Sequence, residues 1–239
     1  MSLPKTPHPI VELQIPSTKK KELFRPMLVG DEKILLIAKT SGEILDMFRS
    51  IKQVVNNCAL SDNFNIDKCT LFDMEYLFLQ LRAASINNIS KITYIDNEDQ
   101  KEWNFSVDLT KIVVKFPSEK NDIISLSDDG VVGMKMKYPS ASIFDDNTFF
   151  TLEGENSFFE LIIRCIDKIY DGEEIFDIAN YTNDELKTFI ENQSLTALTK
   201  IKEFMNSIPK LSYIIKYTNS LGNDKEIELK TLTDFFTLG

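Results

Sequence analysis

Hydrophobic and polar residues follow a helical period in the first part of the chain, an alternating period in the middle and a helical period again toward the end. Ile10–Ile15 alternates, and with the extended run that follows it predicts an opening β-hairpin. The acidic pair Asp31–Glu32 starts a helix through Ala38, since carboxylates suit the positive end of a helix. Ile44–Cys58 repeats apolar residues at steps of three and four, which predicts a helix with one face in the core.

The segment Phe72–Ser85, FDMEYLFLQLRAAS, is apolar on nearly every side of a helix. Thr70 or Asp73 is expected to cap its start. Beyond the first turn its plainly polar positions are Glu75, Gln80 and Arg82. A helix that is apolar all round is buried in a large core or against a partner, so this pattern describes packing and names no reaction.

The middle of the chain, from about Ser90 to Tyr138, alternates apolar and polar residues between polar turns. This period predicts a series of β-strands. Asp128-Asp129-Gly130 is the clearest turn among them, and Asp-Gly between two strands is typical of a hairpin corner.

The last part of the chain returns to a helical period. A wide apolar face predicts a helix over Asn156–Tyr170, and Thr182–Glu185 forms a capping box that starts another. Ser194 is expected to cap a further helix, which a proline ends. Leu211–Tyr217 and Glu226–Leu229 then predict a closing β-hairpin.

These elements predict an α+β fold with an amino-terminal β-hairpin and helices, a β-rich middle insert, and carboxy-terminal helices with a closing β-hairpin. The expected regions are 1–89, 90–152 and 153–239, where the third region can share one helical core with the first. With 239 residues, 43% of them hydrophobic, the chain can bury a core of its own.

Composition narrows the classes of partner. The net charge of −10 and the sequence pI near 4.8 argue against broad contact with nucleic acid or an anionic membrane. No apolar run approaches the roughly 20 residues that a membrane-spanning helix needs. The first residues, MSLPKTPHP, lack the apolar core of a signal peptide, so we expect an intracellular protein.

The residue types of common active sites are sparse. Cys58, Cys69 and Cys165 are widely spaced and lie mostly among apolar neighbours, which predicts reduced, buried thiols. The one histidine, His8, lies between two prolines near the terminus, so neither a Cys–His pair nor a zinc site is expected. The polar loop Ser61–Lys68 lacks the spacing and the glycine of a calcium loop.

The carboxylate pairs have ordinary structural explanations. Asp73 with Glu75 fits a helix start, Glu173-Glu174 follows a glycine, and Asp184-Glu185 belongs to the capping box. The glycines form no phosphate-binding loop. The sequence therefore predicts no catalytic residue, no metal site and no cofactor.

Paired phenylalanines are the strongest sign of an interaction surface. They occur at Phe149-Phe150, Phe158-Phe159 and Phe235-Phe236, and adjacent residues of a helix or strand point in different directions. Large exposed aromatic side chains anchor protein interfaces. Core packing is nevertheless the commoner explanation for the first two pairs, and Phe235-Phe236 could equally fold back as a plug. The candidate interface residues are Phe72, Leu77, Phe78, Phe235 and Phe236.

The order of these segments resembles the base-plate hub protein family of T4-like contractile-tailed bacteriophages. The similar blocks are FRPMLVGDEKILLIA at 24–38, SIKQVVNNC at 50–58, FDMEYLFLQLRAAS at 72–85, MKMKYPS at 134–140, CIDKIYDGEEIFD at 165–177, SIPKL at 207–211 and TLTDFF at 231–236. The opening hairpin with its acidic-start helix is also similar to tail-assembly chaperones of other phages.

The resemblance implies a late viral protein without enzymatic activity that helps to build the hub of the tail base plate. Its partners would be other tail or base-plate proteins, such as a hub or tape-measure protein, and neither nucleic acid nor membrane. It would act in the host cytoplasm during assembly, and as a subunit it would stay in the virion tail base plate. The first alternative is a transient tail-assembly chaperone that is absent from the virion. The second is a tail-tip cell-wall hydrolase with Glu173 or Asp73 as its carboxylate.

Overall fold

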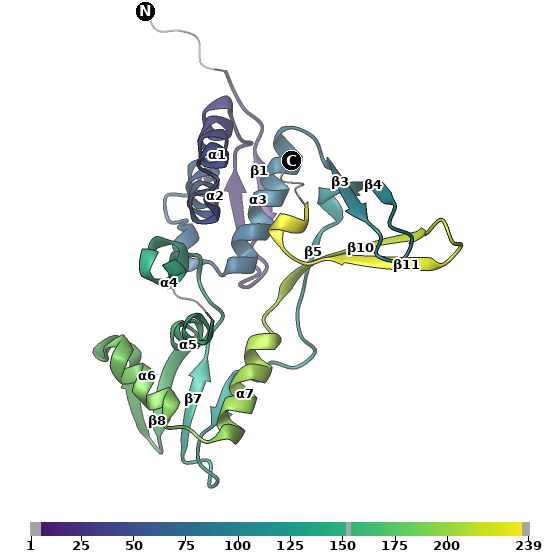
Figure 1. Cartoon of the computed structure of the whole chain (residues 1–239). Coiled ribbons are helices and arrows are strands. Elements are labelled where there is room, and N and C mark those ends of the chain that lie inside the picture. The colour runs from purple at the N-terminus through teal and green to yellow at the C-terminus, as the bar shows by residue number, and fades with distance from the viewer. Residues whose placement is uncertain (1–5, 152–153, 236–239) are drawn as a thin grey trace, which may run out of the picture. The chain divides into compact units, whose positions relative to one another are not determined.

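The computed structural model describes residues 6–151 and 154–235, which form two compact units (Figure 1). The first unit consists of Met1–Lys115 and Lys210–Gly239, and the second unit is Phe116–Pro209. Both units combine helices with small antiparallel sheets, which confirms the predicted α+β class. The boundaries of the three expected regions, 1–89, 90–152 and 153–239, stay a prediction.

The opening hairpin forms as expected. Strand β1 (Val11–Gln14) pairs antiparallel with β2 (Lys21–Phe24). In the connecting turn the amide of Lys19 donates to the carbonyl of Ile15 over 2.8 Å, and Lys19 adopts a φ of 61°. The side chain of Phe24 is fully buried, so the hairpin packs on the helices that follow it.

The helices α1 (Val29–Ser41), α2 (Ile44–Cys58) and α3 (Leu71–Ser85) follow the hairpin. The bounds of α2 are those that its apolar period predicts. Helix α1 starts two residues before Asp31, because the Asp31 carboxylate lies in the first turn and accepts the backbone N–H of Leu28 over 2.8 Å. Thr70 caps α3 together with Asp73, so both expected capping residues take part.

Helix α3 is the central helix of the first unit. Met74, Leu77, Leu79 and Leu81 have no exposed surface, although they point in different directions around the helix axis. The helix is thus buried on most sides, as the pattern of Phe72–Ser85 indicates, and its polar positions Glu75, Gln80 and Arg82 are partly exposed.

Two long hairpins complete the first unit and lie side by side (Figure 1). Their strands are β3 (Ile89–Ile95) with β4 (Glu102–Asp108), and β10 (Lys210–Thr218) with β11 (Asp224–Leu229), and β5 (Val113–Lys115) adds to β10. The ring of Tyr217 packs 5.2 Å from that of Trp103, and its hydroxyl donates to Asp96 over 2.7 Å. The closing hairpin is therefore confirmed, and it packs against strands more than 100 residues earlier in the chain.

The second unit is a four-stranded sheet with helices. The strand order is β6-β7-β8-β9, all antiparallel. The strands are β6 (Ile123–Ser125), β7 (Val132–Met136), β8 (Ile166–Asp171) and β9 (Glu174–Asp177), and the helices are α4 (Asn147–Thr151), α5 (Glu155–Arg164), α6 (Asn183–Glu191) and α7 (Leu195–Asn206). Asp128-Asp129-Gly130 forms the corner between β6 and β7, as expected.

One element of the second unit differs from its prediction. The expected helix Asn156–Tyr170 ends at Arg164, and the chain continues as strand β8. Ile169 pairs with Met134 of β7, and the sheet buries both side chains. The apolar residues of this stretch satisfy a helical and an alternating period alike, so only the pairing with β7 decides between them.

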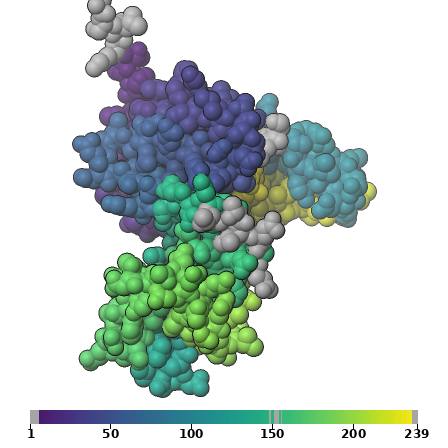
Figure 2. Space-filling model, turned by 60° about the vertical axis from the view of Figure 1, so that its left-hand side comes forward, coloured from purple at the N-terminus to yellow at the C-terminus, as the bar shows by residue number. Residues whose placement is uncertain are grey.

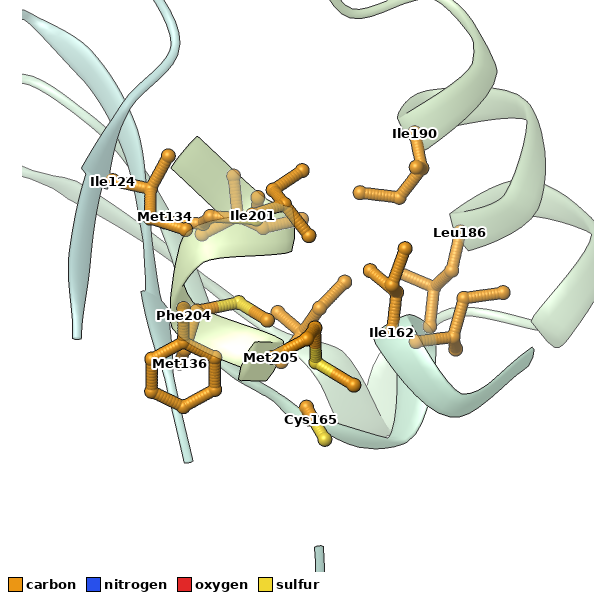
Figure 3. Packing of buried hydrophobic residues seen from close by; sticks show 13 residues of the cluster. Ile124, Met134, Met136, Ile162, Cys165, Leu186, Ile190, Ile201, Phe204 and Met205 are labelled. Carbon is orange, nitrogen blue, oxygen red and sulfur yellow. The ribbon is translucent and has the colours of Figure 1, made fainter. Parts of the chain in front are cut away.

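The core of the second unit lies between the sheet and the helices (Figure 3). Met134 and Met136 of β7 meet Ile162 of α5 and Ile201 and Phe204 of α7, and all five side chains are buried. Short 3₁₀ helices occur in both units at Ile66–Lys68, Leu109–Lys111, Ala141–Asp145, Ile178–Asn180 and Leu232–Phe235. Within residues 6–151 and 154–235, no helix combines the length and the apolar sequence that crossing a bilayer requires.

Candidate protein-docking groove

An open apolar groove of about 650 Å³ lies in the first unit. Helices α1 and α2 form most of it, and α3 and the 3₁₀ helix Leu232–Phe235 contribute the rest. Figure 2 shows residues of α1 and α2, in purple and blue, at the surface of this unit. The apolar lining residues are Leu35, Leu36, Ala38, Ile44, Met47, Phe48, Ile51, Phe78 and Leu232. We call this surface the α1–α2 groove.

The sequence of α1 explains why apolar side chains remain exposed here. Leu35 and Ala38 are buried, whereas Leu36 and Ile37 are 55% and 60% exposed. The run Ile34–Ala38 contains five consecutive apolar residues, and a helix that packs by one face cannot bury all of them. Its remaining members therefore face outward.

The start of α2 extends the exposed apolar surface. Gly42 ends α1 with a φ of 74°, a left-handed conformation that glycine adopts without strain. The chain then reaches α2 within two residues, and Ile44 is 58% exposed at its first position. The tight turn thus brings the exposed residues of both helices to one groove.

Charged side chains lie at the rim of the α1–α2 groove. Arg82 of α3 lies 3.8 Å from Glu32 of α1, and Lys39 and Glu43 also line the groove. Partly exposed ion pairs of this kind contribute little to stability, about 0 to 1 kcal/mol. The rim therefore adds polar contacts around an apolar centre, the arrangement that protein interfaces show.

The candidate interface residues have different positions in the structure. Phe72, Leu77, Phe78 and Phe235 are all less than 5% exposed, and Phe236 lies outside the described residues. Of the four, only Phe78 lines the α1–α2 groove. These four buried side chains are core residues of the first unit. That any of the candidate residues contacts a partner stays a prediction.

The exposed residues of α1 and α2 were not among the candidates. Leu36 and Ile44 carry the accessible apolar surface of the groove, and Ile37 is exposed beside it on α1. The signal for Leu36 and Ile37 is the uninterrupted apolar run within a helix that also carries charged residues. The pair Phe158-Phe159 packs partly buried against the core of the second unit.

The carboxylates considered for hydrolysis lie in unlike surroundings. Asp73 is fully buried and accepts hydrogen bonds from Ser17 and Thr70, whereas Glu173 is exposed in the turn between β8 and β9. Glu75 lies on α3, where burial and then the negative charge of Asp234 raise its pKa to about 7, against a hydrogen bond from the backbone N–H of Leu232. These contacts belong to the packing of helix ends and turns.

The cysteines are buried, as their apolar neighbours indicate. Burial raises the pKa of Cys58 to about 11 and the pKa values of Cys69 and Cys165 to about 12. Thiols with such pKa values are poor nucleophiles at neutral pH. Among the residues that the structure describes, no group of three or more His, Cys, Asp or Glu side chains is arranged to hold a metal ion.

Comparison with known proteins gives one match. A family model described as T4 bacteriophage base plate protein matches residues 7–237, which is nearly the whole chain. Among the curated proteins and the solved structures, none matches. The match covers both units and includes all residues that line the α1–α2 groove.

Proposed function

Since this chain belongs to the T4 bacteriophage base plate protein family, we propose that it is a non-enzymatic structural component of the base-plate hub, which contacts its neighbours through the α1–α2 groove. The family match over residues 7–237 supports the base-plate role, and the place in the hub is the finer part of the proposal. The exposed apolar residues of the groove support it, because contiguous apolar surface on a folded protein marks interaction sites.

The α1–α2 groove offers a partner an apolar anchor site. Leu36 and Ile44 are each more than half exposed, so a partner that covers the groove removes their side chains from water. Each of them then contributes on the order of 1 kcal/mol to binding. Other tail or base-plate proteins are the proposed partners, with the virion tail base plate as the site of action.

A transient tail-assembly chaperone is the second candidate. It is favoured by the opening hairpin β1–β2 in front of α1, the layout that is similar to tail-assembly chaperones, and by the accessible apolar surface of α1. Such a protein would cover a hub or tape-measure protein in the host cytoplasm, and the net charge of −10 would keep the complex soluble.

The groove is tested by complementation of a phage that lacks this gene. Leu36→Asp places a charge in the groove, and Thr40→Asp places the same charge at an exposed position of α1 that does not line it. We expect Leu36→Asp to reduce the yield of complete tails, counted by electron microscopy, by about tenfold or more, and Thr40→Asp to stay near wild type. Thermal unfolding of both purified variants confirms that they fold. Full complementation by Leu36→Asp would exclude the groove as the contact surface.

The absence of enzymatic activity is tested separately by zymography on peptidoglycan. We expect no clearing by the purified chain, because the Asp73 carboxylate is fully buried by its hydrogen-bond donors and Glu173 lies in an exposed hairpin turn. A clearing zone that Glu173→Gln abolishes would make the protein a hydrolase and contradict the proposal.

A further inference from the structure

The charge of the chain is concentrated in one unit. The second unit contains 18 acidic and 8 basic residues, so its net charge is −10, the value of the whole chain. The first unit contains 19 residues of each sign and is neutral. The neutral unit carries the α1–α2 groove. The acidic unit has a negative electrostatic field of its own, which attracts positively charged partners.

The acidic residues are densest where β8, β9 and the start of α6 meet. Residues 169–186 contain six carboxylates and neither Lys nor Arg. All six are exposed, and none of them has a Lys or Arg of the described residues within salt-bridge distance. They are Asp171, Glu173, Glu174, Asp177, Asp184 and Glu185. Their charge is thus not neutralised within the chain.

The same segment forms most of a second apolar groove, of about 400 Å³, between the β8–β9 hairpin and α6. Its walls are largely aromatic, with Phe176, Tyr181 and Phe189 around the buried Leu186. Asp171 and Glu185 are also among its lining residues, and one carboxylate oxygen of Glu185 accepts hydrogen bonds from the backbone N–H and the hydroxyl of Thr182. We call it the β9–α6 groove.

The side chain of Tyr170 occupies the space that the glycine opposite it leaves free. Gly133 of β7 is its strand partner, and a Cβ atom at Gly133 would lie 2.1 Å from the Tyr170 hydroxyl oxygen. The ring of Tyr170 therefore lies over Gly133, on the sheet face opposite to that of Ile169 and Phe176, so Tyr170 does not add its ring to the β9–α6 groove.

We propose that the β9–α6 groove binds a basic, amphipathic segment of another tail or base-plate protein, an inference that rests on the proposed function. Apolar side chains of that segment fill the aromatic groove, and its Lys or Arg side chains lie along the rings and pair with Asp171 and Glu185. The charge complementarity selects this class of partner, because a phosphate-rich nucleic acid or an anionic membrane is repelled by the same carboxylates.

Fluorescence anisotropy with the full-length protein tests this binding. The probe is a labelled amphipathic peptide of about 14 residues built from Lys and Leu, and its counterpart carries Glu in place of Lys. We expect the Lys peptide to bind at least about tenfold more tightly than the Glu peptide, and its affinity to fall as salt rises from about 50 to 300 mM. Equal binding of the two peptides would overturn the proposal.

Two matched charge variants separate the groove from the general charge of the unit. Asp171→Asn with Glu185→Gln removes two charges from the β9–α6 groove, and glutamine keeps the capping interaction of position 185. Glu119→Gln with Glu203→Gln removes two charges at exposed positions outside it. We expect the groove pair to weaken binding of the Lys peptide by about fivefold or more and the control pair by less than about twofold. Equal effects would show binding by charge alone and refute the groove.

The aromatic contribution has its own variant, and its readout is independent of tail assembly. Tyr181→Ala truncates a partly exposed ring of the groove, and we expect it to weaken binding of the Lys peptide by about fivefold or more. Unchanged binding would contradict the role of the rings. If the peptide binds as expected while tails assemble without this protein, the groove stands and the proposed function fails.

Discussion

Asp73 joins the opening hairpin to helix α3, and its removal tests how the first unit is held together. Its carboxylate has no exposed surface and accepts four hydrogen bonds. The backbone N–H and the hydroxyl of Ser17 donate over 2.8 and 2.5 Å, and the backbone N–H and the hydroxyl of Thr70 donate over 3.0 and 2.7 Å. One carboxylate thus accepts the hydrogen-bond donors of both the β1–β2 turn and the start of α3.

Asp73→Ala removes the acceptor and leaves all four donors without it. A hydrogen bond to a charged group contributes about 1.5 to 3 kcal/mol, and the donors of Ser17 and Thr70 partly recover by contact with water. We therefore expect a loss of roughly 3 to 5 kcal/mol in the free energy of unfolding, well below the sum of the separate bonds. Asp73→Asn is expected to lose a similar amount of stability. The NH₂ group of the asparagine is itself a donor, and it would face the donors of Ser17 or Thr70 without an acceptor.

Urea unfolding followed by circular dichroism measures this loss. Asp62→Ala is the matched control, since Asp62 is an exposed loop residue in the same unit, and we expect it to change stability by less than about 0.5 kcal/mol. The reasoning would be refuted if Asp73→Ala lost no more stability than Asp62→Ala, because the buried carboxylate would then have no structural role.

Three further predictions concern pH, packing and thiol reactivity. Folding raises the pKa of Glu75 from 4.5 to about 7. Between these pH values the folded chain holds a proton on Glu75 that the unfolded chain has lost, so the free energy of unfolding falls as the pH rises. Urea titrations at about pH 5 and 8 measure this loss of stability in the wild type and in Glu75→Gln. We expect the loss to be smaller in Glu75→Gln by up to about 3 kcal/mol, and the same pH dependence in both proteins would contradict the prediction. Gly133→Ala is expected to displace the ring of Tyr170 and cost about 1 to 3 kcal/mol, whereas an unchanged unfolding midpoint would show that the ring moves freely. The three buried cysteines are expected to react with a thiol reagent only in denaturant, and fast labelling of the native chain would disprove their burial.

The local elements of the first unit could be predicted because their signals are strong and local. The period of Ile44–Cys58 fixes α2 to the residue, and the capping residues Thr70 and Asp73 mark the start of α3. The stretch Cys165–Tyr170 was wrongly predicted as helix because its apolar residues suit both periods, and its strand partner Met134 is distant in sequence. Pairing between distant segments is not visible in a local pattern.

The candidate site was harder to predict than the fold. The most apolar segment, Phe72–Ser85, attracts attention as an interface, yet such a segment is also the best candidate for the core. The accessible apolar surface of the groove comes from Leu36 and Ile44, which the packing of α1 and α2 leaves exposed. The β9–α6 groove combines residues of three separate segments, so its aromatic walls become visible only in the folded chain.

Quantitative mass spectrometry of purified phage tails tests the central claim most directly. A structural component of the base plate is expected in the tails at a small integer ratio to a known hub protein. The matched sample is an immunoprecipitate from infected cells taken before lysis, which reports the partners during assembly. Absence from the tails, together with a hub or tape-measure protein in the precipitate, would contradict a structural role and identify a transient assembly chaperone.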